Sequence, residues 1–129
     1  MSAAPRSVSS SRLSVLCRVV VMSPARHDRL LAATSHLSHL VAYSVAGATP
    51  RDGLAVAPPS FLDVTRIAKS DPDLWDDIFL SNRTELLTAM DRFDRHWRLL
   101  RSLLARADRA RLRRVLSNAQ RKRHALKDS

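Results

Sequence analysis

Arg66 is the side chain in this sequence best suited to hold an anionic ligand. It lies in the segment FLDVTRIAKSDPDLWDDIFLSN, residues 61–82, between Asp63 and Trp75. A guanidinium held by its neighbours can bind a carboxylate through two parallel hydrogen bonds. Spacing alone favours a plainer interpretation, in which Asp63 and Arg66 form an ion pair one helical turn apart. By pattern alone, Trp75 is likewise more typical of a core residue than of a ligand contact.

Ser35, His36 and His39 form a second group of polar residues. His36 and His39 are three residues apart, so both could reach one metal ion from a single helical turn. The sequence has no HExxH motif and no organised third ligand beside them, so we expect no metal site. A buried or capping histidine is the commoner arrangement. His39, one turn beyond Ser35, is also compatible with the polar wall of a pocket.

The glycine and cysteine content excludes several other kinds of site. Gly47 and Gly53 are the only two glycines, so no glycine-rich phosphate loop can be written, and we expect no cofactor-binding residue in this chain. The single cysteine, Cys17, rules out a disulfide within the chain. A reducing cytoplasm is the expected location. No apolar run approaches the ~20 residues that span a bilayer, so we expect no membrane partner.

The formal net charge of +10 raises an alternative, a basic helical module that binds nucleic acid or a protein partner. The predicted last helix has a densely basic face, Arg109 to Lys127. However, it lacks interleaved aromatic residues for base stacking, and Asp91 and Asp94 are interspersed with the preceding arginines. The marked excess of arginine over lysine is also what GC-rich coding produces. We therefore favour a solvated charged face and do not expect a nucleic-acid partner.

The elements that must position these residues are predicted to be helices. Apolar residues recur at helical spacing over residues 25–48, 82–107 and 108–126, and Ser70-Asp71-Pro72 is a helix-start signal. Residues 49–60 are expected to form a long irregular loop, and the β-branched run at 16–22 a short strand. On the second long helix we expect one core face: Leu86, Leu87, Met90, Phe93, Trp97, Leu100, Leu103 and Leu104.

Two blocks carry a resemblance to a known family. They are MSPARHDRLLAATSHLSH, residues 22–39, and FLDVTRIAKSDPDLW, residues 61–75, which is followed by IFLSN. In order, spacing and helix placement the chain resembles the C-terminal helical domain of prephenate and arogenate dehydrogenases over about residues 18–126. The resemblance implies an all-α domain of about four to five helices, two of them long, as in 6-phosphogluconate-dehydrogenase-like enzymes.

The resemblance also implies a function. Members of that family oxidatively decarboxylate prephenate or arogenate in tyrosine biosynthesis, with NAD or NADP held by an N-terminal Rossmann domain that also supplies the catalytic histidine. By position, Arg66 resembles the arginine that binds a substrate carboxylate, and Ser35 and His39 resemble pocket residues. Asp63 and Trp75 resemble positions that orient the surroundings of that arginine. A homodimer formed through the helices is expected.

This sequence departs from the family pattern at three places. Ser38 stands where the family usually has proline, and Pro58-Pro59-Ser60 replaces a glycine-containing turn. No Rossmann domain is encoded, so we expect no catalysis by this chain alone and consider a separate Rossmann-domain chain. The expected organisation is a disordered or unrelated leader at 1–15, a strand and linker left from that domain at 16–24, and the helical domain at 25–127.

Overall fold

A computed structural model describes residues 20–126 of the chain. All regular elements in this range are helices: α1 (Pro24–Leu31), a π-helical turn (Ala32–His36), α2 (Leu37–Ala48), α3 (Arg51–Ala55), α4 (Pro59–Thr65), a 3-10 turn (Arg66–Lys69), α5 (Pro72–Ser81), α6 (Arg83–Ala105) and α7 (Arg109–His124). The all-α prediction is confirmed. The predicted strand at 16–22 falls mostly outside the described range, and its last three residues adopt no regular structure.

The helix boundaries follow the capping signals. The hydroxyl of Ser23 accepts a hydrogen bond from the backbone N–H of Arg26, with Pro24 at the first position of α1. The Asp71 carboxylate caps α5 in the same way through the N–H of Asp73. The Asp108 carboxylate caps α7 through the N–H of Arg111. These short-range bonds satisfy donors that a helix start would otherwise leave without partners.

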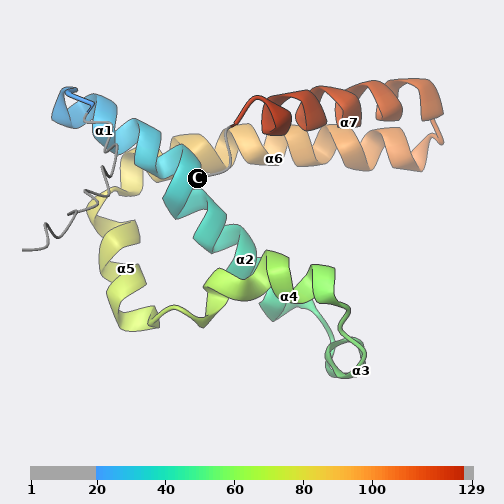
Figure 1. Ribbon diagram of the computed structural model, residues 1–129, viewed down its shortest axis with the longest axis horizontal. Coiled ribbons are helices and arrows are strands. Elements are labelled where there is room, and N and C mark those ends of the chain that lie inside the picture. Colours follow the sequence, from blue (N-terminus) through green and yellow to red (C-terminus); the bar gives the residue numbers. More distant parts are fainter. Residues whose placement is uncertain (1–19, 127–129) are drawn as a thin grey trace, which may run out of the picture.

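The helices are arranged as an open frame rather than a closed bundle (Figure 1). The continuous rod of α1, the π turn and α2 crosses the first part of α6, and α7 returns alongside the second part of α6 as an antiparallel hairpin. At the other end, α4 and the 3-10 turn pack on α2. The predicted loop at 49–60 was wrong in part, because it contains α3 and the beginning of α4.

The core lies where the first rod meets α6. Ala32, Leu86 and Ala89 are buried there, and Leu37, Leu40 and Phe79 pack against them. Small residues allow the two backbones to approach closely, which explains why the crossing is at Ala32 and Ala89. Leu103, 1% exposed, anchors α6 against α7 further along.

The predicted core face of α6 was only partly right. Leu86 and Leu103 are buried, but Trp97 is 59% and Leu104 64% exposed. Leu87, Met90 and Phe93 are exposed as well. The periodicity marked the apolar side of the helix correctly, but within this chain too few helices cover it.

Candidate functional site

A stack of two rings joins the first rod to α5. The imidazole of His39 on α2 lies face to face with the indole of Trp75 on α5, with ring centroids 3.4 Å apart and an interplanar angle of 19°. Phe79, one turn further along α5, lies against the same indole at 5.4 Å. Trp75 and His39 are both half-buried. The stack therefore leaves part of each ring open to a ligand.

Ser35 fixes the orientation of His39 through its backbone. The Nδ1 of His39 lies 3.0 Å from the carbonyl oxygen of Ser35. Because a carbonyl can only accept, Nδ1 carries the proton, and in the neutral ring Nε2 is left as an acceptor. His39 can therefore accept a hydrogen bond from a ligand hydroxyl through Nε2 or, once protonated, donate one to an anion.

The carbonyl of Ser35 lies within the π-helical turn. The N–H of Leu37 bonds to the oxygen of Ala32, five residues back, in place of the usual four. Single π turns within α-helices are frequently found at functional sites. Ser38, at the position where a proline was expected from the resemblance, donates its hydroxyl proton to the carbonyl of Thr34. The π-helical turn therefore precedes a serine in this chain, at the position where the resemblance led us to expect proline.

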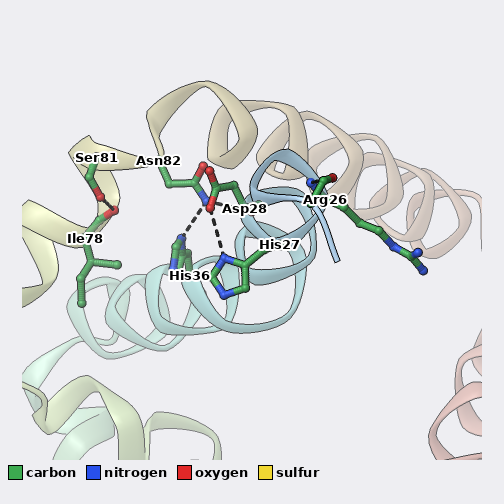
Figure 2. A network of polar contacts seen from close by, with 8 residues as sticks. Arg26, His27, Asp28, His36, Ile78, Ser81 and Asn82 are labelled. Atoms are coloured by element: carbon green, nitrogen blue, oxygen red, sulfur yellow. Dashed lines mark hydrogen bonds and ion pairs between the residues drawn. The ribbon is translucent and has the colours of Figure 1, made fainter. Parts of the chain in front are cut away.

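His36 also contacts the indole of Trp75. Its ring meets Trp75 edge to face at 6.2 Å and 79°. The side-chain amide of Asn82 donates to the backbone oxygen of Asp28 at 2.8 Å and approaches Nδ1 of His36 at 3.4 Å (Figure 2). Burial lowers the pKa of His36, the nearby His39 lowers it further, and Asp28 opposes the shift. Because the Asn82 amide nitrogen can only donate, Nδ1 of His36 is the acceptor in this contact.

Arg66 lies at the start of the 3-10 turn that packs on α2. Its side chain is exposed, and it forms no ion pair or hydrogen bond with any other residue in the described range. The Asp63–Arg66 ion pair favoured by spacing alone is therefore not formed, although Asp63 is exposed one turn away. The guanidinium is available to a ligand.

The backbone on both sides of Arg66 is fixed by side-chain hydrogen bonds. Thr65 is buried and donates its hydroxyl proton to the oxygen of Phe61 at 2.7 Å. The Tyr43 hydroxyl, from α2, donates to the oxygen of Ser70 at 2.7 Å. These bonds hold the 3-10 turn against the helix that carries His39. The arginine therefore projects from an anchored segment rather than from a free loop.

The structure thus brings Ser35, His39 and Trp75 into direct contact, and it leaves Asp63 and Arg66 outside that contact network. The sequence analysis considered His36 as a metal ligand, with a buried or capping histidine as the commoner alternative, and the structure places it buried. Within residues 20–126, no three His, Cys, Asp or Glu side chains gather as a metal site. Asn82 and Tyr43 were missed. Tyr43 follows His39 by one helical turn, which is the one signal that could have indicated it.

The class defined by this fold and site is a helical domain that offers an aromatic platform, an oriented imidazole and a free guanidinium. The family model described as "Prephenate dehydrogenase, dimerization domain" matches residues 23–118. The chain belongs to this family.

Two curated relatives and one solved structure indicate where the domain falls in longer proteins. Cyclohexadienyl dehydrogenase of Zymomonas mobilis is 38% identical over 117 residues, which are 85% of this chain and 40% of that protein. Prephenate dehydrogenase of Bacillus subtilis is 33% identical over 107 residues, 78% of this chain and 29% of that protein. Prephenate dehydrogenase from A. aeolicus, solved in complex with hydroxyphenyl propionate and NAD+, superposes with a TM-score of 0.73 at 32% identity, covering 82% of this chain and 39% of that one.

This chain therefore spans less than half the length of each of these relatives. No helix in the described range has both the length and the apolar character needed to cross a membrane.

Proposed function

We propose that this chain forms the substrate-binding wall of a prephenate or arogenate dehydrogenase and that its working form is a homodimer. The observation that carries the proposal is that the exposed guanidinium of Arg66 and the His39–Trp75 stack lie on elements that contact the same helix, α2. A cyclic substrate with a carboxylate needs both features. The hydroxyphenyl propionate in the A. aeolicus structure combines an aromatic ring with a carboxylate.

We propose a role for each residue of the site. Arg66 binds the substrate carboxylate, and the ring of Trp75 lies beside the substrate ring. Nε2 of His39 bonds a hydroxyl or carboxylate of the substrate. Ser35 keeps His39 in the required tautomer. Asp63 is close enough in sequence to orient Arg66 once a ligand is bound. All of these groups bind and orient the substrate, and none of them removes a hydride.

The nicotinamide cofactor would supply the hydride acceptor, and we propose no site for it among the described residues. Gly47 and Gly53 both lie within helices, and neither has the positive φ typical of a phosphate-binding turn. We therefore propose that NAD or NADP is bound by a Rossmann domain outside the described residues, on the same protein or on a separate chain. Turnover of prephenate would then require that domain as well as this one.

Calorimetric titration of the full chain with hydroxyphenyl propionate tests the role of Arg66. A hydrogen bond to a charged group contributes about 1.5–3 kcal/mol. Arg66→Ala is therefore expected to raise the Kd about ten- to a hundredfold. Arg66→Lys keeps the charge but loses the planar guanidinium, so its Kd should lie between those of the wild type and Arg66→Ala.

The matched control for this titration is Arg95→Ala, an exposed arginine on α6 that contacts none of the site residues named above. It should leave the Kd unchanged. Equal Kd values for the wild type and Arg66→Ala would contradict the proposal. So would an equal loss in Arg66→Ala and Arg95→Ala, because general positive charge would then explain the binding.

A further inference from the structure

Helix α5 carries Trp75 but has few contacts that hold it in place. None of its residues is buried, and Phe79 is the α5 side chain that packs against the core. Just before the helix, the oxygen of Ser70 accepts a hydrogen bond from the Tyr43 hydroxyl at 2.7 Å. The position of Trp75, in the middle of α5, therefore depends on how the other end of the helix is held.

Asn82 holds that other end. It lies between α5 and α6, and its half-buried side chain reaches the first rod. The amide nitrogen donates to the backbone oxygen of Asp28 on α1 at 2.8 Å and lies 3.4 Å from Nδ1 of His36 in the π turn. Figure 2 shows the amide between these two partners. One side chain thus joins α1 and the π turn to the end of α5.

The side chain of Asn82 makes these contacts in place of a local one. An asparagine directly before a helix commonly accepts a hydrogen bond from a backbone N–H of the first turn. Asn82 occupies this position before α6, yet its side chain makes no such bond. Its φ of −115° and ψ of 30° also lie outside the extended region that is usual for a cap. The side chain therefore serves the contact with the rod rather than the start of α6.

We infer that Asn82 is a positioning residue, which sets the place of the Trp75 ring through His36. The chain of contacts is short. The amide of Asn82 meets Nδ1 of His36, and the His36 ring meets the indole of Trp75 edge to face, with centroids 6.2 Å apart. A His36 ring free to turn would change the surface against which the indole rests. Groups behind a binding residue fix its geometry in this way.

The consequence for ligand affinity rests on the proposed function, in which the Trp75 ring lies beside the substrate ring. His39 stacks on the same indole at 3.4 Å, so a displaced indole would also disturb the imidazole proposed to bond the substrate. Asn82 contributes to binding without touching the ligand. Its effect should therefore be seen first on Trp75 and only then on the Kd.

Nitrogen-15 NMR of the full chain without ligand tests the positioning directly. Asn82→Ser keeps a residue suited to the position before α6, but the serine side chain is too short to reach Asp28 and His36. The indole N–H signal of Trp75 is expected to shift. The signal of Trp97, which stacks on Phe93, should stay in place.

The matched control is Ser81→Ala, which removes the hydroxyl that donates to the oxygen of Ile78 at the same junction. It should leave both indole signals in place, and far-UV circular dichroism should show unchanged helix content in both variants. A Trp75 signal that does not move in Asn82→Ser overturns the inference. An equal shift in Ser81→Ala overturns it as well, because any disturbance of the junction would then suffice.

Calorimetric titration with hydroxyphenyl propionate tests the effect on binding. Asn82→Ser is expected to raise the Kd about five- to tenfold, as the loss of one ordinary hydrogen bond does. His36→Phe keeps a ring beside Trp75 but has no acceptor for Asn82. In that background Asn82→Ser should raise the Kd less than about twofold. A full rise in both backgrounds would contradict an action through His36.

The spectra without ligand separate this role from the proposed function. If Asn82→Ser moves the Trp75 signal but the wild type binds no hydroxyphenyl propionate, the positioning of Trp75 stands and the substrate site is refuted. If the wild type binds the ligand and Asn82→Ser binds it with the same Kd, the substrate site stands and the positioning role of Asn82 is refuted.

Discussion

At the scale of single residues, the two histidines beside Trp75 have different environments and therefore different capacities. His39 is half-buried, and its Nδ1 proton is held by the carbonyl of Ser35, which leaves Nε2 for a ligand. His36 is 8% exposed and accepts at Nδ1 from Asn82. In each ring, a neighbouring group therefore fixes whether Nδ1 donates or accepts a hydrogen bond. We expect His39 to be the ring that meets substrate and His36 to be the ring that holds Trp75 in place.

The lowered pKa of His36 predicts a pH dependence of stability. Its ordinary value is 6.5, and burial, aided by His39 and His27 and opposed by Asp28, makes protonation harder in the folded state. Between the folded pKa and 6.5 the unfolded chain binds more protons, so stability falls as the pH drops through this window. Above pH 6.5, His36 is largely neutral in both states and no longer lowers the stability.

Urea unfolding at about pH 7 and about pH 5 measures the effect. We expect His36→Gln, which cannot titrate, to lose less stability over this interval than the wild type does. The exposed His124 on α7 provides the control, because His124→Gln should keep the wild-type pH dependence. The same loss in wild type and His36→Gln would show that His36 is not the residue responsible.

At the scale of elements, the turn between α6 and α7 has a well-defined geometry with an unusual residue. The N–H of Asp108 bonds to the oxygen of Leu103, and the N–H of Ala107 bonds to the oxygen of Leu104, each at 3.0 Å. This is the Schellman pattern, which normally has glycine at the left-handed position. Here that position is Ala107, with φ of 51°.

Ala107→Gly is therefore expected to stabilise the chain by about 0.5–1 kcal/mol. It relieves the steric cost of a left-handed alanine, about 1–2 kcal/mol, against a smaller cost for the more flexible unfolded chain. The measurement is thermal unfolding followed by circular dichroism. Ala119→Gly, an exposed position inside α7, should instead destabilise by about 1 kcal/mol. A lower Tm for Ala107→Gly would contradict this account of the turn.

The elements could largely be predicted from the sequence, because their ends are marked by local chemistry. Ser23-Pro24, Asp71-Pro72 and Asp108 each cap the helix that was expected to follow. The π turn and α3 could not, since neither has a capping signal of its own. The partial exposure of the apolar stripe on α6 could not be predicted either. Periodicity identifies the apolar side of a helix but not whether the same chain covers it.

The candidate site was predictable in part for the same reason. The family resemblance indicated Ser35, His39 and Trp75, and the structure joins these three. However, the stack couples α2 to α5 across 36 positions of sequence, and the pattern of either helix alone favoured a core role for Trp75. Arg66 was weighed against an ion pair with Asp63 that is not formed. The substrate roles of all five residues, Ser35, His39, Asp63, Arg66 and Trp75, stay predictions.

At the scale of the whole molecule, the open frame is explained by what its two exposed regions are proposed to meet. The exposed apolar side of α6, with Met90, Phe93, Trp97 and Leu104, would be covered in the proposed homodimer. The side holding Arg66 and the His39–Trp75 stack would be closed by substrate and a cofactor domain. Five apolar residues are buried below a tenth of their surface in the described range. So sparse a core in a helical domain is consistent with stability gained on assembly.

The two tryptophans allow the central claim to be tested directly, because Trp75 lies at the proposed substrate site and Trp97 lies on the exposed apolar side of α6. Nitrogen-15 NMR resolves their two indole N–H signals, and Trp97→Phe assigns them. On titration of the full chain with hydroxyphenyl propionate, we predict that the Trp75 signal shifts in a saturable way and that the Trp97 signal does not. A saturable shift of Trp97 alone, or no shift of either signal, would contradict the claim that this chain forms the substrate-binding wall.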